Sequence, residues 1–173
     1  MNIYYAKTLL YAYRNLTAVA DQIDELVEKR ALSSMRDFSP ALSQCEKIVD
    51  LTFQKDVLFA LKLTIEEVFS KFSAEDMKYF HYKYMKDMPK SYYDGFDATT
   101  RRYFRKQIRL AKKFAERLEN KGVTDYWFEN NCLEIEFFKE LLKRVIERER
   151  ALSKSQPKPV KAVTPAMKLK KTA

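Results

Sequence analysis

Glycine is almost absent from this chain, and that scarcity limits the folds it can adopt. Only Gly95 and Gly122 occur among its 173 residues. Tight β-hairpin turns depend on residues that accept a positive φ, and glycine does so at the lowest cost. A multi-stranded sheet would need several such turns. We therefore expect an all-α protein, a multi-helix bundle.

The clearest helical pattern lies at residues 99–121, TTRRYFRKQIRLAKKFAERLENK. The preceding Asp97-Ala98-Thr99-Thr100 supplies residues that cap helix N-termini, and Gly122 favours a left-handed cap at the other end. Apolar residues recur at intervals of four, three, four and three. This spacing predicts one stripe by which the helix packs against the protein: Phe104, Ile108, Ala111, Ala115 and Leu118.

The charge of this segment is strongly basic. It holds nine Lys or Arg residues against two Glu, a local charge of +7. The C-terminal stretch 153–173 adds six lysines and no acid, so the rest of the chain carries −4 within the total of +9. Two basic segments on a mildly acidic body indicate a polyanionic partner.

The helical patterns divide the chain into four regions. We expect an N-terminal helical region at 1–72, a helix-turn-helix-like region at 73–122, one C-terminal helix at 123–152 and a disordered Lys-rich tail at 153–173. The tail is rich in Lys, Pro, Ser, Thr and Ala, and has little apolar surface to bury.

Particular helix starts and core positions also follow from these patterns. Ser39-Pro40 predicts a helix start, followed by one long helix to Phe72 or by two helices broken near Thr52. Periodicity places Leu26 and Val27 together near one core-facing side, and Leu63 within the apolar pattern of the long helix. Further helices are expected to start at Ser73 and Thr124, because both residue types cap N-termini.

Residues 73–118 have the layout of a helix-turn-helix unit. An aromatic helix ends at Met88-Pro89, a short helix follows at 91–96, and the basic helix comes after a turn. Arg and short polar side chains at the start of a recognition helix can contact base edges, and later cations can bind phosphates. The nucleic-acid-binding residues predicted in this way are Thr99, Thr100, Arg101, Arg102, Arg105, Lys106, Arg109, Lys112 and Lys113.

The segment from Phe72 to Leu118 resembles the fourth region of bacterial sigma factors and the sigma-like activators of phage late transcription. Lys90-Ser91-Tyr92 matches the opening of the family's first motif helix, and Thr100-Arg101-Arg102 matches the start of its recognition helix. The resemblance covers about a quarter of the chain, which as a whole resembles small bacterial proteins of unknown function. It implies a sigma-like transcriptional regulator that binds duplex DNA, with RNA polymerase or a second copy as protein partner.

Two other functions fit the same residues. The first is a helical protein–protein adaptor that uses its aromatic N-terminal and C-terminal helices, with a basic face that is only solvated. The second is RNA binding, in which the same cations recognise the shape of the nucleic acid.

Several other classes of function are disfavoured. The chain has no glycine-rich phosphate loop, nucleophile elbow or paired-histidine motif, so we expect no enzyme and no cofactor. His81 is the only histidine, and Cys45 and Cys132 have no metal-ligand spacing, so we expect no metal site. The sequence contains no signal-peptide pattern and no apolar run long enough for a membrane span, which predicts a cytoplasmic protein without membrane contact.

Overall fold

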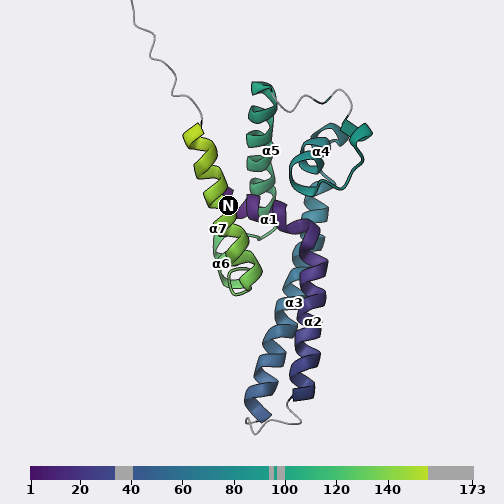
Figure 1. Cartoon of the computed structure of the whole chain (residues 1–173), viewed down its shortest axis with the longest axis vertical. Helices are drawn as coiled ribbons and strands as arrows, with labels where there is room; N and C mark the ends of the chain where they lie inside the picture. The colour runs from purple at the N-terminus through teal and green to yellow at the C-terminus, as the bar shows by residue number, and fades with distance from the viewer. Residues whose placement is uncertain (34–40, 94–95, 97–99, 156–173) are drawn as a thin grey trace, which may run out of the picture.

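The computed structural model describes residues 1–33, 41–93, 96 and 100–155, and every regular element in these ranges is helical. The all-α prediction is therefore confirmed. Figure 1 shows a long helical hairpin, α2 and α3, that projects from a body containing α1 and α4 to α7. The lysines predicted to form a C-terminal tail beyond Ser155 lie outside the described residues.

The hairpin is built from α2 (Leu16–Ser33) and α3 (Ala41–Phe69). Helix α3 runs without a break through Thr52, so the single-helix alternative is the correct one. The expected start at Ser39-Pro40 lies outside the described residues. Two polar contacts link the helices along their length. Lys55 Nζ lies 2.7 Å from an Asp24 carboxylate oxygen, and Lys62 Nζ donates to Thr17 Oγ1 at 2.9 Å.

Helix α3 carries apolar residues on two opposite sides. Leu58, Leu61 and Ile65 are buried on the side that packs into the protein. Leu63 is 66% exposed, so its predicted core position is wrong. It lies two residues from both Leu61 and Ile65, about 200° around the helix from each. Leu26 and Val27 were predicted on the same side of α2. Val27 is partly buried, but Leu26 is exposed, so its prediction is wrong.

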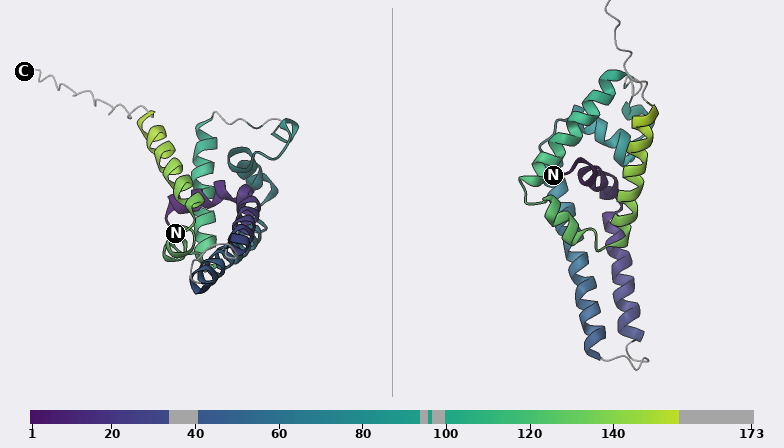
Figure 2. Two further views of the ribbon diagram at one scale, coloured as in Figure 1. Left: turned by 60° about the horizontal axis from the view of Figure 1, so that its bottom comes forward. Right: turned by 90° about the vertical axis from the view of Figure 1, so that its left-hand side faces the viewer.

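Helix α1 (Ile3–Ala12) lies at the centre of the body. Figure 2 shows it enclosed by the other body helices, and it packs against both α5 and α7. Leu9 and Leu10 are completely buried, and the Tyr5 ring stacks on Phe128 with centroids 4.5 Å apart. Residues from the expected regions 1–72, 73–122 and 123–152 thus share one hydrophobic core.

A short irregular segment precedes the basic helix. Ser73 caps α4 (Ala74–Phe80) as predicted, its side chain accepting a hydrogen bond from the Asp76 amide. A π-helical turn, His81–Met85, follows and ends at Lys86, which has a left-handed φ of 53°. The helix therefore ends earlier than the predicted stop at Met88-Pro89. The structure next forms a 3₁₀ turn at Lys90–Tyr93.

The C-terminal part contains two helices where the sequence predicted one. Gly122 has the expected left-handed conformation, and Thr124 caps α6 (Asp125–Asn131). The chain then turns, and α7 (Glu136–Ser155) begins. Cys132 and Ile135 are buried at this break, so the turn itself is part of the core. Helix α7 extends into the stretch from Ser153 that was expected to be disordered.

Candidate nucleic-acid interface

Helix α5 (Arg101–Glu119) positions the predicted cations. Its N-cap is Thr100, whose side-chain oxygen accepts a hydrogen bond from the Tyr103 amide at 3.3 Å. Thr100 thus acts as the cap, and Thr99 lies outside the described residues. The buried side of α5 is formed by Tyr103, Gln107, Leu110, Ala111, Phe114, Ala115 and Leu118.

This buried side differs from the predicted stripe. Ala111, Ala115 and Leu118 are buried as expected, but Phe104 is 51% exposed and Ile108 is 54% exposed. The inward positions in the first half of α5 are instead occupied by Tyr103 and Gln107. Each precedes the expected residue by one position, which is a rotation of about 100° on a helix. The prediction for Phe104 and Ile108 is therefore wrong.

Aromatic packing accounts for this rotation. The Tyr103 ring stacks on Tyr79 of α4 with centroids 5.7 Å apart, and contacts Phe96 edge-on at 5.6 Å. Burial raises the pKa of Tyr103 to about 12, so its hydroxyl stays protonated at neutral pH. That hydroxyl oxygen accepts a hydrogen bond from the Gln107 amide at 3.3 Å.

Six of the predicted cations lie on the exposed side of α5. Among the described residues none of them forms an ion pair. On a helical wheel they form two rows about 80° apart. We call these six residues the basic face: Arg101, Arg105 and Lys112 in the first row, and Arg102, Arg109 and Lys113 in the second.

Other cations of the same segment have partners within the protein. Lys106 Nζ lies 2.6 Å from the Asp76 carboxylate and 5.6 Å from the centroid of the Tyr79 ring. The Arg117 guanidinium lies over the Phe72 ring, 4.1 Å from its centroid. Lys121 forms an ion pair with Glu67 of α3. These partners are distant in sequence, so no local pattern revealed them.

The expected helix-turn-helix unit is not shown among the described residues. Lys90-Ser91-Tyr92, which matched the first motif helix, belongs to the 3₁₀ turn. The helix before it, α4, has seven residues and ends in the π-helical turn. The basic helix is present and capped, but the elements preceding it differ from the predicted layout.

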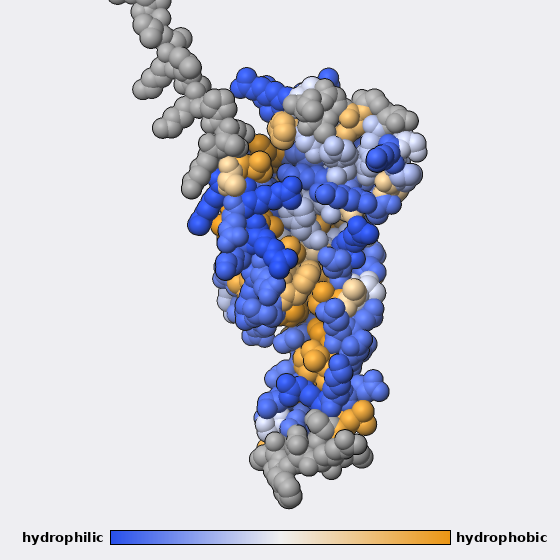
Figure 3. All heavy atoms as spheres, in the orientation of Figure 1, coloured by the Kyte–Doolittle hydropathy of each residue, from blue (hydrophilic) through white to orange (hydrophobic). Residues whose placement is uncertain are grey.

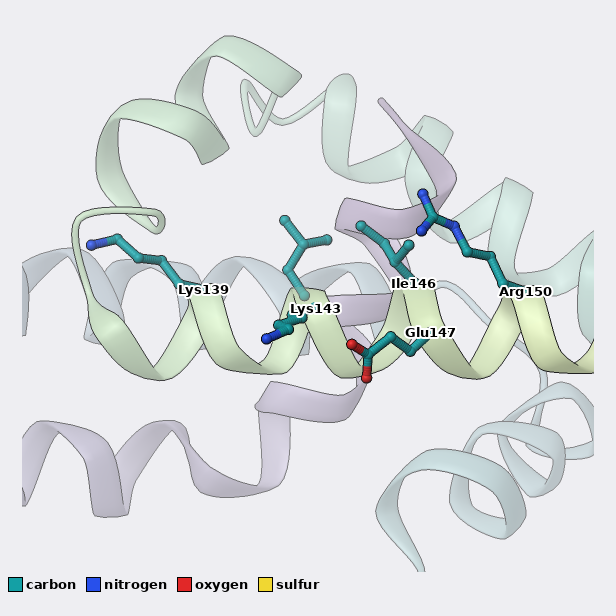
Figure 4. Close-up of a pocket in the computed structure, with 6 residues that line it drawn as sticks. Lys139, Lys143, Ile146, Glu147 and Arg150 are labelled. Carbon is teal, nitrogen blue, oxygen red and sulfur yellow. The ribbon is translucent and has the colours of Figure 1, made fainter.

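A shallow groove runs beside α7, and sequence reasoning did not identify it. Figure 4 shows Ile146 and Arg150 projecting on one side of α7, whereas Glu147 lies on another. The groove has a volume of about 390 Å³ and is lined by Lys139, Leu142, Lys143, Ile146, Glu147 and Arg150. It is open and formed by one helix, unlike the enclosed pockets that hold small ligands.

In the described part of the chain, no cluster of three or more His, Cys, Asp or Glu residues is arranged to hold a metal ion. No helix found there is long and apolar enough to cross a membrane. Comparison of the chain with protein-family models, curated proteins and solved structures gives no match.

Proposed function

We propose that the protein binds duplex DNA through the basic face of α5 and acts as a regulator of transcription. The observation that carries this proposal is the set of six exposed cations on one helix, which have no ion pairs among the described residues. Cations paired within a protein must lose their partners before they can bind phosphate. Unpaired exposed cations bind it directly and release the counterions of the duplex.

The dimensions of the basic face suit a duplex. Arg101 and Lys113 are twelve residues apart, which is about 18 Å along a helix. The major groove is about 12 Å wide and accepts one helix, with a phosphate strand on each side. In this proposal the later cations of the two rows face the two strands. Arg101 and Arg102, in the first turn, reach base edges, and the later cations bind phosphates.

The role in transcription is supported by the resemblance of Phe72–Leu118 to sigma region four, which covers the whole of α5 except its last residue. Because the preceding elements differ from a helix-turn-helix unit, the proposal rests on α5 itself.

The test is binding of the purified full-length protein to a labelled duplex of random sequence, measured by fluorescence anisotropy across a salt series. The affinity should fall steeply with salt, with a slope of log K against log salt of about −0.9 for each phosphate contacted. In Arg109→Ala/Lys113→Ala, two such contacts are removed. The slope should therefore become shallower by about 1.8, and affinity at low salt should drop at least tenfold.

The matched control is Lys47→Ala/Lys143→Ala, which removes the same charge from exposed positions on α3 and α7. It should bind almost as tightly as wild type. Equal losses in both variants would show that net charge alone drives binding, and would overturn the proposal. So would loss of binding when only residues 156–173 are deleted. If the protein binds a double-stranded RNA of the same sequence more tightly than the DNA duplex, the basic face is an RNA-binding surface.

A further inference from the structure

The outer side of α3 is an uncovered apolar surface. Val49 is 65% exposed and Phe53 is 60% exposed. They are four residues apart, so they lie one above the other on one side of the helix. Figure 3 shows hydrophobic surface interrupting the hydrophilic surface along the projecting hairpin. A helix with apolar residues on two opposite sides normally buries both of them.

The charges next to these residues are acidic. Glu46, Asp50 and Asp56 are all exposed, and helical spacing places them around Val49 and Phe53. Two lysines of α3 contact α2 instead: Lys55 contacts Asp24 and Lys62 contacts Thr17. We call Glu46, Val49, Asp50, Phe53 and Asp56 the acidic α3 strip.

Helix α5 carries a strip of the same shape and the opposite charge. Phe104 and Ile108 are also four residues apart and about half exposed. Arg101, Arg105 and Lys112 are three or four residues from one of them, so they lie beside this apolar pair. We call these five residues the basic α5 strip.

We propose that the basic α5 strip of one copy docks on the acidic α3 strip of a second copy. Each strip offers two apolar side chains in the same spacing, and the charges beside them are complementary. Pairing of α3 with α3 would place acids against acids, and pairing of α5 with α5 would place cations against cations. Like charges in an interface are costly, so charge selects the α3–α5 contact.

The fold prevents one copy from satisfying both strips by itself. Val49 and Phe53 belong to the first half of α3, and Phe104 and Ile108 to the first half of α5. Figure 1 shows α5 in the body, away from the tip of the hairpin. The contact therefore joins different surfaces on two copies. Two copies that exchange this contact form a closed dimer, and copies joined head to tail form chains or larger rings.

The self-association does not depend on the proposed DNA binding, but it has a consequence for it. Arg101, Arg105 and Lys112 belong both to the basic α5 strip and to the basic face. If both proposals hold, duplex DNA and a second copy compete for α5, and added duplex dissociates the assembly.

The test uses two variants of the full chain, each with one damaged strip. Val49→Ser/Phe53→Ser removes the apolar pair of α3, and Phe104→Ser/Ile108→Ser removes that of α5. All four positions are exposed, so the helices should remain folded, as circular dichroism will show. Sedimentation is measured from micromolar to about 100 µM at low salt, because small interfaces bind in this range.

Wild type should form species larger than a monomer as concentration rises. The fraction of these species should be smaller at high salt. Each variant alone should be monomeric. An equimolar mixture should form a 1:1 pair, because the intact α5 strip of one variant meets the intact α3 strip of the other. The control Leu32→Ser/Tyr126→Ser, at exposed positions on α2 and α6, should associate like wild type.

A charge exchange gives a second measurement. Glu46→Lys/Asp50→Lys should weaken association at least tenfold, and adding Arg101→Glu/Arg105→Glu to the same chain should restore it. The proposal fails if wild type stays monomeric, or if the mixed serine variants do not pair. It also fails if the α5 variant still dimerises while the α3 variant does not, since that result indicates α3–α3 pairing. Loss of association in the control variant would indicate that the copies associate through non-specific apolar contacts. That result would also overturn the proposal.

Discussion

The side-chain amide of Gln107 on α5 donates a hydrogen bond to the main-chain carbonyl oxygen of Tyr79 on α4, at 2.8 Å. Gln107 is one of the few buried polar side chains in the described part of the protein. The bond joins segments 28 residues apart and fixes the rotation of α5 that leaves Phe104 and Ile108 exposed. The orientation of the basic face therefore depends on a buried amide.

Replacing Gln107 with Ala should lower the free energy of unfolding by about 2 kcal/mol, because the partly buried Tyr79 carbonyl loses its side-chain donor. Chemical denaturation followed by circular dichroism measures the change. Gln22→Ala, at an exposed position on α2, is the control and should change stability by less than about 0.5 kcal/mol. Equal effects of the two substitutions would contradict a structural role for the buried bond.

Alanine substitutions of Arg117 and Arg109 should affect different properties, although both are arginines of α5. The first should change stability and the second DNA binding. The Arg117 guanidinium packs over Phe72, so Arg117→Ala should cost about 1 kcal/mol of stability and leave the salt dependence of DNA binding unchanged. Arg109 is exposed, so Arg109→Ala should leave stability unchanged and weaken binding. Thermal melts and anisotropy on the two proteins measure both properties. A shallower salt slope in Arg117→Ala would place this residue in the interface.

Lys83 should destabilise the folded protein at neutral pH. Burial lowers its pKa, and the nearby Lys7 charge lowers it further. The folded state thus binds this proton more weakly than the unfolded state. The cost is present below the folded pKa and disappears as pH rises through the interval between that pKa and the ordinary lysine value. Lys83→Met should therefore raise the free energy of unfolding at pH 7.

The stability difference between Lys83→Met and wild type should shrink as pH rises into that interval, which urea titrations at several pH values measure. Lys47→Met, at an exposed site, serves as the reference. A difference that stays constant with pH would mean that the gain comes from packing and not from the charge.

The two cysteines should differ in reactivity toward a thiol reagent. Cys132 is completely buried, and burial raises its pKa to about 12. At pH 8 its reactive thiolate fraction is therefore only about 10⁻⁴. Cys45 is exposed. In the native protein about one cysteine should react quickly with the reagent. In the unfolded protein both cysteines should react quickly. Cys45→Ser should lose the fast phase, and retention of that phase would contradict the assignment.

Local signals in the sequence predicted helix ends better than helix faces. The caps at Ser73 and Thr124 and the left-handed Gly122 depend on residues within one turn, and all three were predicted correctly. Thr100 was one of four residues expected to supply the cap of α5, and the structure selects it. The break after α6 was missed because Leu133 and Phe137 continue the apolar helical pattern across it, and no Gly or Pro marks the turn.

The faces of α3 and α5 were harder to assign because both helices have more apolar residues than one side can bury. Periodicity alone cannot rank Phe104 against Tyr103, or Leu63 against Leu61. The choice depends on long-range contacts, such as the stacking of Tyr103 on Tyr79. The cations of the basic face were identified from sequence, whereas the pairing of Lys106 with Asp76 required the fold.

The projecting part of the α2–α3 hairpin also determines where the protein opens first. Away from the body, each helix there is packed against one neighbour, and its backbone hydrogen bonds lie near solvent (Figure 1). Regions with few buried contacts open at a lower free energy than the core and do so as a unit. Amide hydrogens around Val49 and Phe53 should therefore exchange with deuterium well before those of Leu9 and Leu10, while the body stays folded.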